Sequence, residues 1–369
     1  MTLSLTFRYG TYRSDIYKRG IFENVVPTVT TDPNKLEAQA KEAMTSRGYN
    51  YVTGGADEGA TMGANRPAFR QWKTYDSSLL VSPVGVQTIF HRDRELGIAE
   101  IATKLGVPYI ISTAASSSIE DVAQASGDGL RWFQLYWPQE DEITLSVSLH
   151  PLARKCNFSV LIVTLGTWAL SWRPWDLDSA YVPFMEGIGD NTSFTDLAVR
   201  RIFQSDHLEH KSVDEDRHAA ALAWQGDGPI VLKGTQHVDD ARKVVEVGMD
   251  GVIVSNHGGR QLGGAIGSPE VLPEIVDAVR NDVTIPFDSG VCAGADVINA
   301  LCLGAKGVCI GRPWLYGLGI AGKSGAKVLQ GILADLDQSM GLARVKDTAG
   351  CERAMPRRVS YGADEKSLD

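Results

Sequence analysis

The sequence is poor in several features that define other protein classes. It has only five cysteines, none spaced as CxxC, at positions Cys156, Cys292, Cys302, Cys309 and Cys351. An odd, scattered set argues against a disulfide framework and a zinc site, so we expect no metal and a reducing, cytoplasmic compartment. No apolar run approaches the ~18 residues of a membrane span. The N-terminal segment also lacks the apolar core of a secretory signal.

Positive charge is also scarce. The chain has 36 Lys and Arg against 45 Asp and Glu, a net charge of −9. Its isoelectric point is near 5.4. This balance argues against a nucleic-acid partner held by a general phosphate-binding field. It leaves room for a local cationic pocket that binds a small acidic substrate.

Short apolar runs of β type alternate along the chain with helical patterns. The predicted strands are Leu79–Ser82, Pro108–Ser112, Arg131–Leu135, Val160–Thr164, Pro229–Lys233, Gly251–Ser255, Ile285–Asp288 and Gly307–Ile310. Helices are predicted between most of them, for example over Asp239–Val247 and Pro269–Val279. Eight such units predict an α/β fold, a (β/α)8 TIM barrel with an N-terminal helical extension. An open doubly wound sheet is the alternative.

A single domain is expected, with an extension over residues 1–78, the barrel over 79–340 and a tail over 341–369. A helix is predicted from Asp32-Pro33 to near Gly48. The polar segment Asp178–Asp216 follows the fourth strand, where barrels often carry a lid. The GxGxxG pattern of Gly317–Gly322 follows the last strand rather than opening a strand–turn–helix unit, so a dinucleotide fold is rejected.

Most predicted strands end in a polar residue that a packed core would not select. These residues are Ser82, Ser112, Gln134, Tyr136, Thr164, Lys233, Ser255, His257, Asp288, Gly311 and Arg312. A lone Ser or Thr at a strand end is usually a turn former. Together, however, these residues predict a site at the C-terminal face of the barrel, where barrel enzymes carry their chemistry.

The densest motif is Ser255-Asn-His-Gly-Gly-Arg-Gln261. Its glycines allow close backbone approach to a ligand, His257 can exchange a proton near pH 7, and Arg260 can hold a carboxylate bidentately. Lys233 closes the run PIVLK and can stabilise negative charge that develops during a reaction. The alternatives without a functional role are a structural histidine at His257 and a solvated strand end at Lys233.

Two further segments carry candidate cations. Asp288-Ser-Gly290 together with Gly311-Arg312 has the composition of a barrel phosphate corner. The Trp-rich segment from Thr164 to Leu177 contains Arg173, which is either a positioned, partly desolvated cation or part of an interface.

These motifs resemble those of the FMN-dependent L-2-hydroxy acid oxidases and dehydrogenases. The similarity runs from about Tyr12 to Lys327 and rests on YVTGGADE, FQLYWP, LKGTQH, SNHGGRQ and the DSG…GRP pairing, while WRPWDLD is similar to the lactate 2-monooxygenase branch. The resemblance implies FMN-dependent oxidation of a 2-hydroxy acid at its α-carbon, with electrons passing to the flavin and then to O2. The substrate would be lactate-like or a larger specialised metabolite. The resemblance also implies a homo-oligomer, a tetramer, without a membrane partner.

The resemblance also assigns roles to residues. His257 would be the general base. The substrate would be held by Tyr51, Tyr136, Arg173, His257 and Arg260. The cofactor would contact Pro83, Val84, Gly85, Ser112, Gln134, Thr164, Lys233, Ser255, Asp288, Gly290, Cys292, Gly311 and Arg312.

The chain departs from the family pattern at several places. Gly166 replaces an aspartate that normally pairs with the base histidine, and Cys292 replaces an arginine on the FMN phosphate. The chain is also shortened between Trp72 and Val81 and between Phe203 and Gly226. These departures keep two alternatives open: a catalytically impaired flavin-binding protein that kept the fold, and a barrel enzyme of another class, such as an isomerase that uses the phosphate corner. Oxidase and monooxygenase outcomes also stay open.

Overall fold

The computed structural model describes residues 11–71, 79–136, 151–167, 170–186, 188–189, 228–343, 345, 351 and 353. Parallel strands pair in sequence order, and the eighth pairs with the first to close a barrel. They are β1 (Leu79–Val81), β2 (Tyr109–Ser112), β3 (Arg131–Tyr136), β4 (Leu161–Thr164), β5 (Ile230–Thr235), β6 (Gly251–Val254), β7 (Pro286–Phe287) and β8 (Gly307–Ile310). The predicted barrel is confirmed and the open sheet is excluded.

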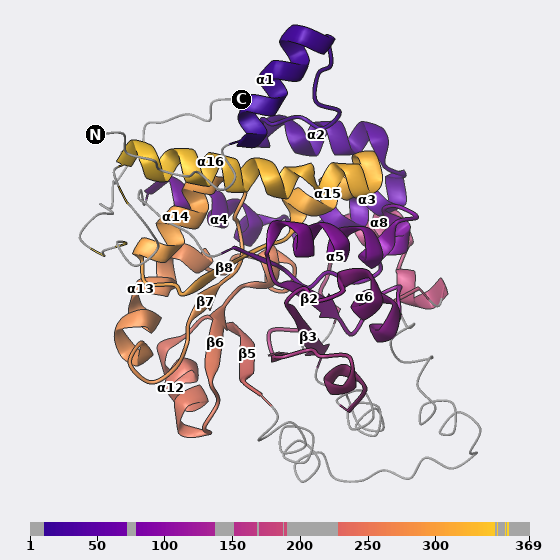
Figure 1. Cartoon of the computed structure of the whole chain (residues 1–369). Helices are drawn as coiled ribbons and strands as arrows, with labels where there is room; N and C mark the ends of the chain where they lie inside the picture. The colour runs from indigo at the N-terminus through magenta and orange to yellow at the C-terminus, as the bar shows by residue number, and fades with distance from the viewer. Residues whose placement is uncertain are drawn as a thin grey trace, which may run out of the picture.

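Helices surround the strands (Figure 1). They are α5 (Arg94–Leu105), α6 (Ile119–Ser126), α8 (Pro174–Asp178), α12 (Val238–Glu246), α13 (Ser268–Val279), α14 (Gly294–Cys302), α15 (Arg312–Ala321) and α16 (Lys327–Ala343), with short 3-10 turns η1 (Gln87–Ile89), η3 (Pro183–Glu186), η4 (His257–Gly259) and η5 (Gly322–Ala326). Most of the GxGxxG pattern lies inside α15, which confirms that it is no phosphate loop. Helix α16 continues past the predicted barrel boundary at residue 340. None of the described helices is long and apolar enough to cross a bilayer.

The barrel interior is layered. One cluster of inward side chains consists of Leu80, Ile110, Ile162, Val231, Ile253 and Cys309. Because side chains alternate along a strand, the residue two positions later on each strand faces the same interior. Those residues are Ser82, Ser112, Thr164, Lys233, Ser255 and Gly311. The apolar layer therefore closes the barrel from below and presents a polar layer at its C-terminal mouth.

The N-terminal extension differs from the prediction in detail. It contains α1 (Thr11–Glu23), α2 (Pro33–Ala43), α3 (Ser46–Thr53) and α4 (Ala60–Gln71). Asp32 caps α2 as expected, but the predicted continuous helix to Gly48 is wrong. The chain is extended at Thr45, whose side chain accepts from Gly48 N and starts a new helix.

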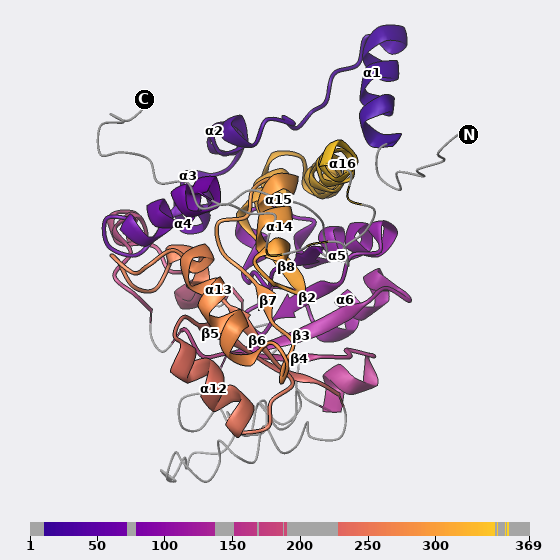
Figure 2. The same cartoon turned by 90° about the vertical axis from the view of Figure 1, so that its left-hand side faces the viewer.

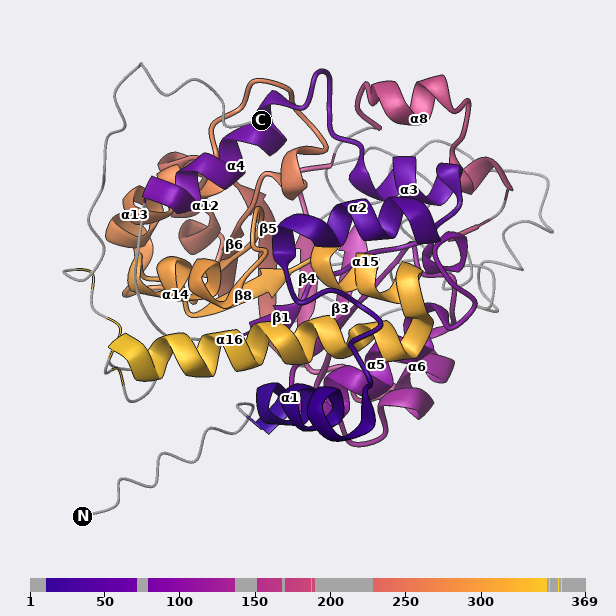
Figure 3. The same cartoon turned by 90° about the horizontal axis from the view of Figure 1, so that it is seen from above.

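Three of these helices pack against segments at the barrel mouth. Helix α4 contacts η4, α3 contacts α8, and α2 contacts α15, as the view from above illustrates (Figure 3). Helix α1 instead lies beside α16, joined to α2 by an extended segment (Figure 2), and has no buried residue. The extension thus brings Tyr51 of α3 over the polar layer, while α1 takes no part in the mouth.

Candidate active site

A buried ion pair occupies the mouth between β5 and β7. Lys233 Nζ lies 2.8 Å from Asp288 Oδ2 and donates to Ser255 Oγ at 3.1 Å. Ser255 Oγ and Ser82 Oγ both donate to the Asp288 carboxylate, at 2.5 and 3.1 Å. Burial alone would raise the pKa of Asp288, but Lys233 and the two hydroxyls outweigh it and lower that pKa. The ammonium is therefore fixed at the mouth by a partner that stays ionised.

A second set of hydrogen-bonded polar side chains spans β2, β3 and β4. Ser112 Oγ donates to Gln134 Oε1 at 2.9 Å, and Gln134 Nε2 donates to Thr164 Oγ1 at 2.9 Å. Pro83, Val84 and Gly85 follow β1 beside these residues. A Cβ on Gly85 would lie 2.5 Å from the Ala114 carbonyl oxygen, so only glycine fits.

His257 sits in a left-handed turn after β6. Its own φ is 56°, followed by Gly258 at 66° and Gly259 at 73°. A Cβ on Gly259 would lie 2.6 Å from the backbone nitrogen of Met62 in α4. The glycines therefore permit both the turn and the close approach of α4. Ser255 Oγ accepts the His257 N–H at 3.1 Å and ties the turn to the ion-pair network.

The described partner of the His257 ring is a hydroxyl. Its Nδ1 lies 3.1 Å from Thr167 Oγ1, and the donor depends on the tautomer. Burial lowers the pKa of His257 well below its usual value, and Lys233, Arg260, Arg173 and Arg312 lower it further. No carboxylate is among these causes, so Asp176, a candidate for the missing charge, does not serve this ring. The departure predicted at Gly166 thus has an electrostatic consequence.

Arg260 joins the histidine turn to α3. Its NH1 donates to the carbonyls of Tyr51 at 2.5 Å and Gly54 at 2.8 Å, and its Cζ lies 5.0 Å from the centre of the Tyr51 ring. The planar guanidinium is therefore held both by backbone and by an aromatic face.

Arg173 is the second cation at the mouth. Its Nε donates to Ser171 Oγ and to the Arg260 carbonyl, each at 3.2 Å. Its NH1 lies 3.7 Å from Asp176 Oδ2, and both side chains are 5% exposed. Burial and the nearby Arg260 lower the pKa of Arg173 to about 10. Two cations thus converge on one small volume, which favours an anionic ligand there.

Tyr136 faces the same volume from β3. Its ring centre lies 6.4 Å from that of His257. Burial and the neighbouring Tyr51 raise the pKa of Tyr136 to about 12, against the opposite influence of Arg173 and Arg260. The phenol therefore keeps its proton at neutral pH and can donate a hydrogen bond.

The phosphate corner is a cavity of about 400 Å³ lined in part by Asp288, Gly290, Cys292, Gly311 and Arg312. Arg312 donates through Nε to the Val52 carbonyl and through NH1 to the Gly258 carbonyl, both at 2.9 Å. Helix α15 begins here with no side-chain cap. An anchored guanidinium and a helix N-terminus suit a phosphate, so these residues fit FMN.

The same corner holds fewer cations than the family pattern. The backbone N–H of Cys292 donates to Asp296 Oδ2 at 2.9 Å, and the thiol replaces a guanidinium. Glu37 of α2 also lines this cavity, where its carboxylate opposes an anionic group. The corner therefore fits a phosphate with less compensating charge.

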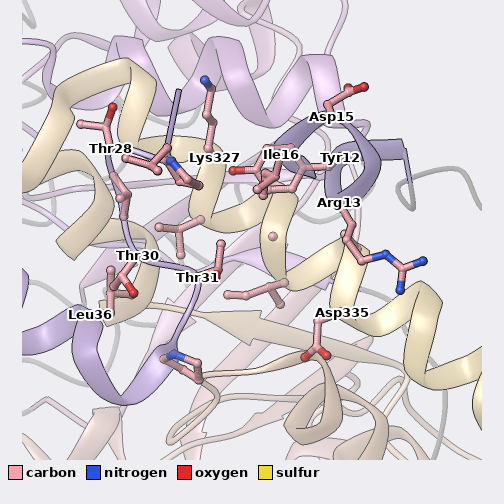
Figure 4. Close-up of a pocket in the computed structure, with 18 of the residues that line it drawn as sticks. Tyr12, Arg13, Asp15, Ile16, Thr28, Thr30, Thr31, Leu36, Lys327 and Asp335 are labelled. Carbon is pink, nitrogen blue, oxygen red and sulfur yellow. The ribbon is translucent and has the colours of Figure 1, made fainter. Parts of the chain in front are cut away.

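A larger cavity lies elsewhere. It has a volume of about 670 Å³ and lies between α1, the segment after it and α16 (Figure 4). It shares Leu36 and Cys292 with the phosphate corner but contains none of the predicted substrate residues. The residues expected to carry the chemistry therefore lie at the barrel mouth and not in this larger cavity.

The structure brings the predicted residues together as a group. They lie at strand ends of the mouth, in the loops that follow, at the start of α8 (Arg173) and α15 (Arg312), or on α3 above the mouth. Sequence reasoning missed Thr167 and Glu37 as site residues, and it considered Asp176 only as a substitute for the charge missing at Gly166. Thr167 and Asp176 lie in the segment around the predicted Arg173. Glu37 had no distinguishing signal in the sequence, because α2 also carries the exposed Glu42. The two segments predicted to be shortened lie outside the described residues, except for Leu79–Val81. Most of the predicted lid, Asp178–Asp216, also lies outside them.

Comparisons with known proteins agree with this site. The FMN-dependent dehydrogenase family model matches residues 73–358. The chain is 49% identical to the FMN-dependent alpha-hydroxy acid dehydrogenase qulF of Penicillium citrinum over 402 residues, covering 98% of both chains. That alignment is longer than the 369-residue chain, so the relative has residues with no counterpart here.

More distant relatives have similar names. An L-lactate oxidase of Lysinibacillus sphaericus is 34% identical over 85% of this chain and 89% of its own length. Among solved structures, a mandelate oxidase variant bound to (S)-mandelic acid has a TM-score of 0.77 at 29% identity, covering 90% of this chain and all of that one.

Proposed function

Because the chain belongs to the FMN-dependent dehydrogenase family and is an oxidoreductase acting on the CH–OH group of 2-hydroxy acids, we propose that it binds and oxidises such an acid at the barrel mouth. Arg173 and Arg260 bind the carboxylate, and Tyr51 and Tyr136 orient the acid. The single observation that carries this proposal is the convergence of the Arg173 and Arg260 guanidiniums, the Tyr136 phenol and the His257 imidazole on one volume.

His257 is the proposed general base. Its lowered pKa keeps the ring neutral at pH 7, so one nitrogen is free to accept a proton from the substrate. If Nδ1 donates to Thr167 Oγ1, the basic lone pair lies on Nε2. FMN held at the mouth would supply the acceptor for the two electrons. Lys233, held by Asp288, supplies fixed positive charge at the mouth.

We propose that Ser112, Gln134, Thr164 and the segment Pro83–Gly85 contact the flavin ring. Asp288, Ser255, Gly290, Cys292, Gly311 and Arg312 would hold its ribityl chain and phosphate. Their support is the polar layer and the phosphate-sized corner beside it.

Several finer points are also proposals. O2 is the proposed acceptor, supported by the printed names of oxidase relatives such as 2-hydroxyacid oxidase 1. A lactate 2-monooxygenase-like outcome rests on WRPWDLD, and a homo-oligomer on family resemblance. A cytoplasmic location rests on the odd number of cysteines and the lack of a CxxC pair.

The experiment uses the purified protein loaded with FMN. Adding (S)-lactate and larger 2-hydroxy acids without oxygen should bleach the visible flavin absorbance, and His257→Gln should slow the bleaching by at least about a hundredfold, as expected for a general base. Bound flavin that no 2-hydroxy acid in the panel bleaches would refute catalysis. That result would favour the impaired flavin-binding protein, for which the neutral partner of His257 is the specific support.

A further inference from the structure

A buried glutamate of α5 contacts the loops that follow β1 and β2. Glu95 lies in the first turn of that helix, which packs against η1, β2 and α6. The residue is fully buried, and no step of the proposed reaction uses it. Because a buried carboxylate is costly unless donors satisfy it, its partners indicate its role.

The partners of this carboxylate come from both loops. Oε1 accepts from the backbone N–H of Ser116 at 2.8 Å and of Gln87 at 3.4 Å. Oε2 accepts from the hydroxyl of Ser117 at 2.7 Å. Burial raises the pKa of Glu95, and these donors oppose that shift. One carboxylate therefore ties the loop after β1 to the loop after β2.

Gln87 extends this support to the segment that is proposed to contact the flavin ring. Its Nε2 donates to the carbonyl of Val84 at 2.9 Å and to the hydroxyl of Tyr109 at 3.2 Å. Val84 is the middle residue of Pro83–Gly85. The position of this segment therefore depends on Gln87, whose backbone contacts Glu95.

The same loop contains a strained residue. Val86 has φ 52° and ψ 32°, in the left-handed region that β-branched residues rarely adopt. Its N–H donates to the carbonyl of Ala114, in the loop after β2, at 2.8 Å. Backbone strain of this kind persists only where surrounding contacts hold it. The contacts of Gln87 and Val86 with the neighbouring elements therefore keep Pro83–Gly85 in place.

We propose that Glu95 is a positioning residue for the flavin: its carboxylate fixes the two loops in the arrangement that lets Pro83–Gly85 lie against the flavin ring. The inference rests on the proposed function, which places the flavin at these loops. The described contacts of the carboxylate are with Gln87, Ser116 and Ser117, so Glu95 acts through them. Hydrogen bonds to a charged group are about twice as strong as those between neutral groups, so a neutral side chain at position 95 weakens this support.

The test uses the FMN-loaded protein with Glu95→Gln and with Gln87→Met. The first removes the charge with little change of shape, and the second removes the amide that holds the Val84 carbonyl. In each variant the visible absorption band of the bound flavin should shift. FMN should also leave about fivefold faster after dilution, as expected when about one hydrogen bond of support is lost. Flavin reduction at saturating 2-hydroxy acid should slow, while the apparent affinity for the acid stays unchanged because Arg173 and Arg260 are untouched.

Two matched variants isolate the effect. Glu100→Gln makes the same change on the same helix at an acid that is ion-paired with lysines, and it should leave the flavin band and the release rate unchanged. Val244→Ala shortens a buried side chain of α12, which packs against α13, β5 and β6. It should lower the melting temperature without altering the flavin band.

The outcomes separate the two proposals. If Glu95→Gln and Gln87→Met change the flavin band and the release rate no more than Val244→Ala does, Glu95 is only structural and the inference is overturned. The double variant should be little worse than the more affected single variant, and additive effects overturn the route through Gln87. Should Glu95→Gln not fold, Ser117→Ala removes one donor, leaves the carboxylate in place and is measured in the same way. A bound flavin that no 2-hydroxy acid bleaches overturns the proposed function instead, because the band and the release rate need no turnover.

Discussion

Restoring a carboxylate with Gly166→Asp tests the central weakness of the site. In the structure, the His257 ring contacts a neutral hydroxyl, and four cations disfavour its protonated form. A carboxylate beside Thr167 would stabilise the imidazolium that forms as the proton transfers. We therefore expect flavin reduction to be slow in the parent and faster in the variant, with unchanged affinity for FMN.

The size of the effect follows from the contact. A hydrogen bond between neutral groups contributes about 0.5–1.5 kcal/mol, and one to a charged group about 1.5–3 kcal/mol. The midpoints of these ranges differ by about 1.25 kcal/mol, which predicts a rate roughly tenfold higher. A Cβ at position 166 would lie 3.1 Å from Gly234 Cα, so the variant requires the backbone there to shift by a few tenths of an ångström.

The assay is anaerobic stopped-flow flavin reduction over a panel of 2-hydroxy acids. Gly166→Asn gives the matched neutral side chain and should show no gain. The acid limb of the pH profile should also move upward in Gly166→Asp, because a carboxylate raises the pKa of His257. Fast reduction in the parent, or no gain in a folded, flavin-loaded Gly166→Asp protein, refutes the reasoning.

Four further predictions follow from the described contacts. Cys292→Arg should tighten FMN binding ten- to a hundredfold, as expected for about 1.5–3 kcal/mol from one charge-assisted contact, and an unchanged dissociation constant contradicts it. Arg260→Lys should weaken the flavin absorbance change induced by substrate far more than the surface control Arg242→Lys does. The reason is that one ammonium cannot span two carbonyls and an aromatic face. Equal, small effects of the two variants argue against carboxylate binding at Arg260. Thr167→Val should slow flavin reduction about two- to tenfold, since it removes one neutral hydrogen bond from His257; an unchanged rate shows that the hydroxyl does not orient the ring. Because the pKa of His257 is lowered, its basic form persists as pH falls, so kcat/KM should begin to fall only below pH ~6.5; an acid limb at or above that value contradicts the lowered pKa.

The barrel and most of its mouth could be predicted from the sequence because both depend on short-range patterns. Buried strands read as continuous apolar runs, and the polar residue that ends each run is visible locally. The break at Thr45 was missed because a single hydroxyl cap decided it against a continuous helical pattern. The contact between Thr167 and His257 joins residues 90 positions apart. It depends on how β4 and β6 place their following loops, which no local pattern encodes.

The close packing of Gly166 on Gly234 bears on whether the lost carboxylate can be regained. Gly234 has a φ of +118°, and a Cβ there would lie 2.5 Å from the backbone nitrogen of Gly166. Position 234 is therefore closed to any side chain, whereas position 166 has no positive φ and a milder contact. The two glycines therefore differ in which substitutions they tolerate. Position 166 can take a side chain as long as position 234 stays glycine. Some glycine codons differ from an aspartate codon by a single base. A single Gly166→Asp substitution would therefore place a carboxylate beside Thr167, provided that Gly234 stays glycine.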